Sequence, residues 1–126
     1  MIKTITTLVV VIQNAILLEG VVLLVEEQQG FLLLGSATTL EGGVALCLAK
    51  HPNCVLLDLD MPSDSSLLAV KTILGADPDA QIIGLVNYEL DVCVSRALAL
   101  GVCAVVGKDQ ISQALLDTIL RRSGPK

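Results

Sequence analysis

The chain alternates short apolar runs with longer segments of mixed character. Five runs rich in leucine and β-branched residues have the length of buried strands; they lie at 7–12, 31–36, 54–59, 81–86 and 102–107. The intervening segments suit helices, which we expect at 15–29, 39–50, 64–75, 89–100 and 110–122. Strands that alternate with helices predict an α/β fold with a parallel sheet. The strands are nearly continuous in apolar residues, as expected when helices cover both faces of the sheet.

Glycine, proline and aspartate mark several expected helix ends. Gly30 and Gly101 stand where helices should stop, and Pro78 follows the third helix. Asp109 could cap the start of the fifth helix. These residues divide the chain into the same alternating elements that the apolar runs predict.

The first expected helix is unusually apolar. Its sequence, AILLEGVVLLVEEQQ, has apolar residues on nearly all sides until Glu26. A helix of this kind is buried or contacts a partner. Either its outer face packs on another subunit or domain, or its ends are misplaced.

Length and charge narrow the classes of protein. With 126 residues, the chain suits one domain spanning 1–126. The longest uncharged run, 4–18, has 15 residues, fewer than the ~20 of a spanning helix, so we expect a cytoplasmic protein with no membrane contact. The net charge is −5 with no basic stripe, so these residues alone should not bind nucleic acid well.

Cysteine and histidine usage favours buried thiols over a metal site. Four cysteines, at 47, 54, 93 and 103, form no C-x-x-C pair and stand beside small or aliphatic residues. They are interpreted as reduced buried thiols of a cytosolic protein. The single histidine, His51, precedes a proline in a loop and is expected at the surface.

Candidate chemistry centres on Asp58. The stretch CVLLDLDMP (54–62) ends a buried strand with an aspartate, and Asp60 follows two places later. Functional groups of open α/β sheets gather at the carboxyl ends of strands. An aspartate there could accept a phosphoryl group beside a divalent cation, act as a phosphatase nucleophile of the D-x-D kind, or serve as a structural carboxylate.

Two segments carry a resemblance to a known family. HPNCVLLDLDMPSDSSLLAV (51–70) and GVCAVVGKD (101–109) resemble the receiver domain of two-component response regulators, most of all LuxR/NarL-type receivers. The resemblance covers essentially the whole chain and implies a doubly wound, CheY-like sheet of strand order 2-1-3-4-5. It implies that Asp58 is the phosphoacceptor, that Lys108 contacts the acyl phosphate, and that the Asp60 carbonyl faces any metal. Met61–Pro62 matches the turn after the acceptor.

The chain departs from the family at the acidic pair that binds Mg²⁺. Alignment through Gly20 places Ile12 and Gln13 at the pair, and a shift of one residue gives Gln13 and Asn14. Neither alignment supplies a carboxylate, although hard cations favour charged oxygen ligands.

A second departure lies at the end of the fourth strand, where receivers carry a switch Ser or Thr. Val86 stands there, with Asn87 next. A milder departure is Ser66, four places after the proline, where a glycine is usual. The pocket therefore keeps its nucleophile and lysine but lacks its metal ligands and its switch hydroxyl.

We therefore expect an atypical receiver that is phosphorylation-independent, is not an enzyme and holds no cofactor. Asp58 and Lys108 should form a plain structural ion pair. One alternative is a conventional receiver phosphorylated on Asp58, with Mg²⁺ bound through Gln13 or Asn14. Another is a small ligand in the pocket. A D-x-D phosphatase is disfavoured because Met61–Pro62 follows the motif and no late acidic pair is present.

Expected partners follow from the family resemblance. They are a histidine kinase or another regulator, and a second copy in a homodimer. The sequence ends in RRSGPK (121–126), where a LuxR/NarL-type regulator begins its linker to a helix-turn-helix. Either the receiver stands alone or such an output domain follows it. In the second case, DNA binding, and with it transcription regulation, would belong to that separate output domain. Arg96 is expected among the exposed residues of segment 89–100.

Overall fold

The computed structural model describes residues 5–60, 65–87, 92–112 and 115–119. Five parallel strands form one sheet in the order β2-β1-β3-β4-β5. The strands are β1 (Thr6–Val11), β2 (Phe31–Ala37), β3 (Cys54–Asp58), β4 (Gln81–Val86) and β5 (Ala104–Gly107). The helices are α1 (Ala15–Glu26), α2 (Leu40–Lys50), α3 (Ser65–Ala76) and α4 (Val92–Leu100). A 3-10 helix, Lys108–Gln110, follows β5, and 115–119 are helical. The expected fold and strand order are confirmed.

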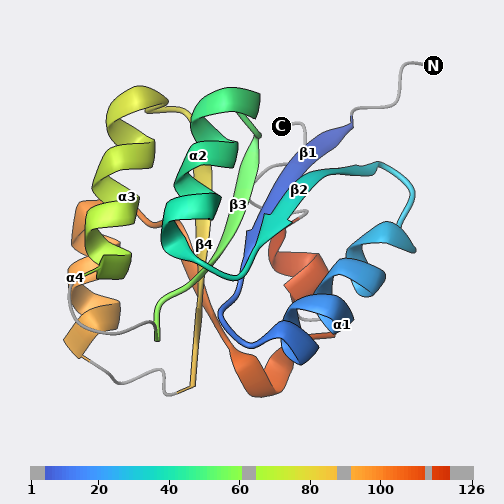
Figure 1. The fold of residues 1–126 in the computed structure, drawn as a ribbon. Coiled ribbons are helices and arrows are strands. Elements are labelled where there is room, and N and C mark those ends of the chain that lie inside the picture. Colours follow the sequence, from blue (N-terminus) through green and yellow to red (C-terminus); the bar gives the residue numbers. More distant parts are fainter. Residues whose placement is uncertain (1–4, 61–64, 88–91, 113–114, 120–126) are drawn as a thin grey trace.

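Helices cover both faces of the sheet (Figure 1). α2, α3 and α4 lie on one side, and α1 lies on the other with the helical segment 115–119. Each side has its own apolar core, which explains why β3 is buried along its whole length. β3 is the middle strand of the sheet, so its carboxyl end has neighbours on both sides.

Some helix ends differ from those expected. α4 ends at Leu100, and Gly101 follows with a φ of 116°, as its sequence predicts. α1 ends at Glu26 rather than 29, because the chain turns toward β2 through Gly30, whose φ is 92°. The expectation for Asp109 is wrong. The chain leaves β5 through a tight 3-10 turn that begins at Lys108, so Asp109 lies inside this turn and caps no α-helix.

The surface of α1 remains apolar with its corrected end. The three residues that the shorter helix no longer includes, 27–29, are all polar. Within α1, Ile16 is 84% exposed and Leu23 is 55% exposed. Leu18, Val21 and Val25 face the core. Within the part of the chain that the structure describes, no helix is long and apolar enough to cross a membrane.

The cysteine and histidine expectations can be checked at four of five positions. Cys47 and Cys54 are buried free thiols, and Cys103 is a partly buried one. His51 is exposed and ends α2 in the left-handed conformation, with a φ of 51°. The side chain of Cys93 lies outside the described part of the structure.

Candidate functional site

Asp58 is the last residue of β3 and lies at the carboxyl end of the sheet. Its side chain is only 3% exposed. Each carboxylate oxygen accepts a backbone N–H: Oδ1 from Asp60 at 2.9 Å and Oδ2 from Gln13 at 3.2 Å. The Nζ atom of Lys108, just after β5, lies 2.9 Å from Oδ1. The chain therefore brings Asp58 and Lys108 together, as expected.

Lys108 has a second carboxylate partner. Its Nζ atom lies 3.0 Å from Oδ2 of Asp60, and the backbone N–H of Asn87 donates to that same oxygen at 2.7 Å. The expectation of a plain pair is wrong, because the side chain after the strand end turns back toward the lysine. We call Asp58, Asp60 and Lys108 the strand-end cluster. Its formal charge is −1, from two carboxylates and one ammonium.

The side chain of Asp60 is the site residue that the sequence interpretation missed. Only its backbone carbonyl was considered, although the D-x-D spacing placed a second carboxylate two residues from Asp58. Through Asp60, the end of β3 is tied both to Lys108 and to Asn87, directly after β4. The cluster therefore links three neighbouring strand ends.

The two carboxylates shift the ionisation of Lys108. Burial of the ammonium lowers the pKa of Lys108, but the hydrogen bonds and charges of Asp58 and Asp60 together outweigh burial. The net result is a pKa above the ordinary value for lysine. Lys108 is therefore charged at neutral pH and holds the cluster together.

The three residues at the expected position of the acidic pair have different environments. Ile12 is completely buried in the core beside α1. The side-chain oxygen of Asn14 caps α1, because it accepts the N–H groups of Ile16 and Leu17 at 3.0 Å each. Gln13 is exposed and contributes its backbone N–H to Asp58. Of these three, only the Gln13 amide is neither buried nor used as a cap.

The remaining pocket positions lie close to the strand-end cluster. Val86 is buried at the end of β4, and Asn87 contributes a backbone N–H rather than its side chain. Ser66 is fully buried, and its hydroxyl donates to the backbone carbonyl of Asp58 at 3.2 Å. The residue that replaces a glycine thus ties the first turn of α3 to β3. Met61–Pro62 lie outside the described residues.

The described side chains do not form a ligand set for a divalent cation. Across the described residues, no group of three or more His, Cys, Asp or Glu side chains could hold a metal ion. The carboxylate oxygens nearest each other at the strand ends, those of Asp58 and Asp60, already accept Lys108 and backbone N–H groups. The arrangement is a charge cluster satisfied from within the chain.

The comparisons with known proteins agree with the fold. The sequence model of the response regulator receiver domain matches residues 8–120. The chain belongs to this family. It is therefore a receiver domain of two-component signalling, and the expected resemblance is confirmed.

Among curated proteins, the receiver is 31% identical over 110 residues to the transcriptional regulatory protein YdfI of Bacillus subtilis. The match covers 87% of this chain and 51% of YdfI, so the chain spans about half the length of that relative.

Two solved structures show the same fold. A LuxR-family DNA-binding response regulator from Staphylococcus aureus aligns with a TM-score of 0.85 and 22% identity, covering 94% of this chain and 99% of that one. A CheY-like receiver domain protein from Methanospirillum hungatei aligns with a TM-score of 0.84 and 19% identity, covering 94% and 93%. The CheY-like architecture expected from the sequence is confirmed.

Proposed function

We propose that this receiver signals without Mg²⁺-dependent phosphorylation of Asp58. The observation that carries the proposal is the position of the Asp60 carboxylate, which accepts both Lys108 and the N–H of Asn87. Asp60 thus supplies a second carboxylate beside Asp58. In this role the strand-end cluster holds the ends of β3, β4 and β5 in one arrangement and needs no added ligand.

Charge supports this proposal. A phosphoryl group on Asp58 would carry about −2 in place of the −1 of the carboxylate. With Asp60 and Lys108 unchanged, the cluster would pass from −1 to about −2. Phosphoryl transfer normally proceeds with metal ions that neutralise the developing charge. Here Lys108 is already shared between two carboxylates.

The available oxygen ligands support it as well. Ile12 has no oxygen in its side chain and is buried, and the oxygen of Asn14 is occupied as a helix cap. This leaves the amide of Gln13, an uncharged ligand, where a hard divalent cation would favour carboxylates. The residues present therefore do not fit a magnesium site, and we propose a domain with no cofactor and no enzymatic step of its own.

The alternative is a conventional receiver phosphorylated on Asp58. It is favoured by one observation, the distance of 2.9 Å between Asp58 and Lys108, which retains the nucleophile and its lysine. Under this alternative, Gln13 and the two aspartates would have to bind Mg²⁺ together. Lys108 would then have to release one carboxylate.

Intact mass after incubation with acetyl phosphate and Mg²⁺ separates the two functions. We expect no phosphoryl adduct on the wild-type chain, under conditions that phosphorylate a conventional receiver in parallel. The matched control is Asp58→Asn, which removes the nucleophile and keeps the shape of the side chain. An adduct on the wild type that is absent from Asp58→Asn would overturn the proposal.

The curated relatives also support a proposal for the role of the whole protein in which this receiver acts. We propose a cytoplasmic transcriptional regulator, because the matched curated relatives are transcriptional regulatory proteins and the match covers about half of each of them. Contacts to DNA would belong to a separate output domain, since this chain carries a net charge of −5. Its own contacts would be with proteins, either a kinase, another regulator or a second copy.

A further inference from the structure

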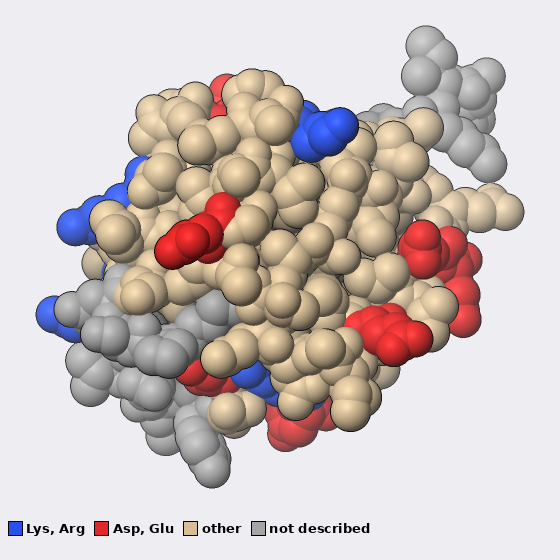
Figure 2. Space-filling model, viewed as in Figure 1, with Lys and Arg blue, Asp and Glu red and all other residues tan. Residues whose placement is uncertain are grey.

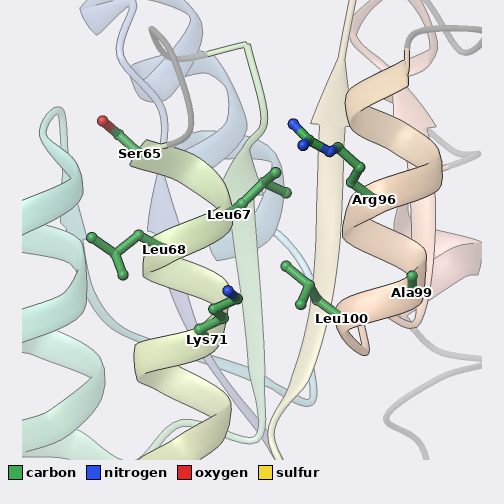
Figure 3. A pocket seen from close by; sticks show the side chains of 7 residues that line it. All are labelled: Ser65, Leu67, Leu68, Lys71, Arg96, Ala99 and Leu100. Atoms are coloured by element: carbon green, nitrogen blue, oxygen red, sulfur yellow. The ribbon is translucent and has the colours of Figure 1, made fainter.

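A groove between α3 and α4 lies on the face opposite α1 (Figures 1 and 3). We call it the α3–α4 groove; its lining residues are Ser65, Leu67, Leu68, Lys71, Arg96, Ala99 and Leu100. Its volume is about 650 Å³, enough for a few side chains of a bound peptide. All seven residues belong to the described part of the chain.

Among the described residues that line the groove, most are apolar, and the two charged ones, Lys71 and Arg96, are positive. In Figure 3, Leu67 and Lys71 on α3 point toward α4, while Arg96 and Leu100 on α4 point toward α3. Leu68 is 65% exposed, and in Figure 3 its side chain points from α3 away from α4. None of the described residues that line the groove is acidic. An exposed apolar surface with charges of one sign is typical of an interaction site.

Cations are scarce elsewhere on the described surface. The described residues include four Lys or Arg side chains: Lys50, Lys71, Arg96 and Lys108. Lys108 belongs to the strand-end cluster, so two of the other three line this one groove. Figure 2 shows Lys and Arg side chains at the edge that carries α3 and α4, beside a broad surface with few charges. The chain as a whole carries −5, so this local positive charge runs against its average.

We propose that the α3–α4 groove binds an acidic amphipathic helix of a partner protein. Leucine-like side chains would pack against the apolar walls at Leu67 and Leu100, and carboxylates would pair with Lys71. This is the helix-in-groove mode of peptide recognition. A nucleic acid suits the groove less well, because two cations neutralise few phosphates and the walls offer apolar aliphatic contacts.

The groove is lined in part by α3, the helix whose first turn is hydrogen-bonded to Asp58 of the strand-end cluster. Ser65 lines the groove, and the next residue, Ser66, donates its hydroxyl to the carbonyl of Asp58. A partner bound along the first turns of α3 would therefore contact the helix that is anchored at the end of β3. Binding itself does not depend on whether Asp58 is phosphorylated, so this proposal and the proposed function can fail separately.

Fluorescence anisotropy with a labelled probe peptide tests the inference. The probe is a designed helix of repeated Glu-Leu-Leu-Glu units, and the control peptide replaces each Leu with Ser. We expect saturable binding of the first peptide and at least tenfold weaker binding of the second. Absence of saturation up to about 1 mM, which corresponds to only ~4 kcal/mol of binding free energy, would overturn the proposal.

Variants locate the binding site. Lys71→Glu should weaken binding of the probe at least fivefold. The side chain of Lys71 is exposed, so the fold should persist, which circular dichroism checks. The matched control is Lys50→Glu, an exposed cation at the end of α2 that does not line the groove. Equal weakening by Lys50→Glu would show that net charge alone drives binding and would contradict the proposal.

Two other occupants would give different results. If single-stranded DNA binds with the Lys71 dependence and the peptide does not, the occupant is a nucleic acid. If sedimentation shows self-association that Lys71→Glu abolishes, and the peptide does not bind, the occupant is a second copy of this chain. Either result overturns the assignment to an acidic helix of a partner protein.

Discussion

The strand-end cluster and the α3–α4 groove both contain cations, but the surroundings of those cations differ. In the cluster, the side chain of Lys108 is 16% exposed and lies within 3.0 Å of two carboxylates. In the groove, Lys71 and Arg96 are exposed beside leucines, and no acidic residue is among the described lining residues. The ammonium of Lys108 is therefore used inside the chain, whereas the side chain of Lys71 is exposed to solvent.

This difference has an energetic consequence. Removing one member of a buried ion pair leaves an uncompensated charge in a poorly solvated place, whereas an exposed cation contributes little to folding. The cluster should therefore respond to substitution through stability, and the groove through binding. α3 takes part in both regions, since Ser66 donates to Asp58 while Ser65 and Lys71 line the groove.

The largest expected effect is that of Lys108→Met. The substitution leaves Asp58 buried beside Asp60 with no cation, so we expect a loss of about 2–4 kcal/mol in the free energy of unfolding. The measurement is urea denaturation followed by circular dichroism. The matched control, Lys71→Met in the groove, should change stability by less than about 0.5 kcal/mol. If the two variants lost equal stability, the contrast between the regions would be wrong.

Alkaline pH should lower the stability of the fold through a second buried group, the thiol of Cys47. Burial, and then the negative charge of Asp77, raise the pKa of the Cys47 thiol from 9.0 to about 11. The folded chain therefore keeps this proton after the unfolded chain has released it. Stability is complete below about pH 9 and falls as pH rises toward 11, by about 2–3 kcal/mol.

Cys47→Ala should remove most of this alkaline loss, as measured by urea denaturation at several pH values. The raised pKa of Lys108 acts in the same direction, because its contribution is present below the unfolded pKa of lysine and is lost as pH rises through the folded one. The residual loss in Cys47→Ala should therefore disappear in the double variant with Lys108→Met. Persistence of the full loss in Cys47→Ala would contradict the assignment to Cys47.

The sequence predicted the fold well because the fold depends on periodic features. Apolar runs covered by helices specify a parallel sheet, and the sequence also predicted the contact between Asp58 and Lys108 at its edge. The sequence predicted a helix from residue 110, but a 3-10 helix, Lys108–Gln110, follows β5 first. The apolar pattern does not predict this turn, because the turn depends on the position of Lys108.

The finer features of both regions depend on tertiary geometry. Asp60 lies two residues beyond β3, where no strand periodicity fixes the direction of a side chain, so its approach to Lys108 could not be read from spacing. Lys71 and Arg96 belong to different helices and form one surface only after α3 and α4 pack side by side.

The smallest effect, Asp60→Asn, tests the residue on which the proposed function depends. The variant keeps an oxygen for the N–H of Asn87 but removes one charge, so Lys108 and Asp58 alone remain as a neutral pair. We expect a loss of about 1 kcal/mol in urea denaturation, together with a pKa of Lys108 closer to its ordinary value in NMR titration. The control is Asp109→Asn, an exposed aspartate next to Lys108 in sequence, which should change stability by less than about 0.5 kcal/mol. If Asp60→Asn matched this control in both measurements, Asp60 would not hold the lysine. The strand-end cluster would then reduce to the plain pair of Asp58 and Lys108, and Asp60 would no longer support the proposed function.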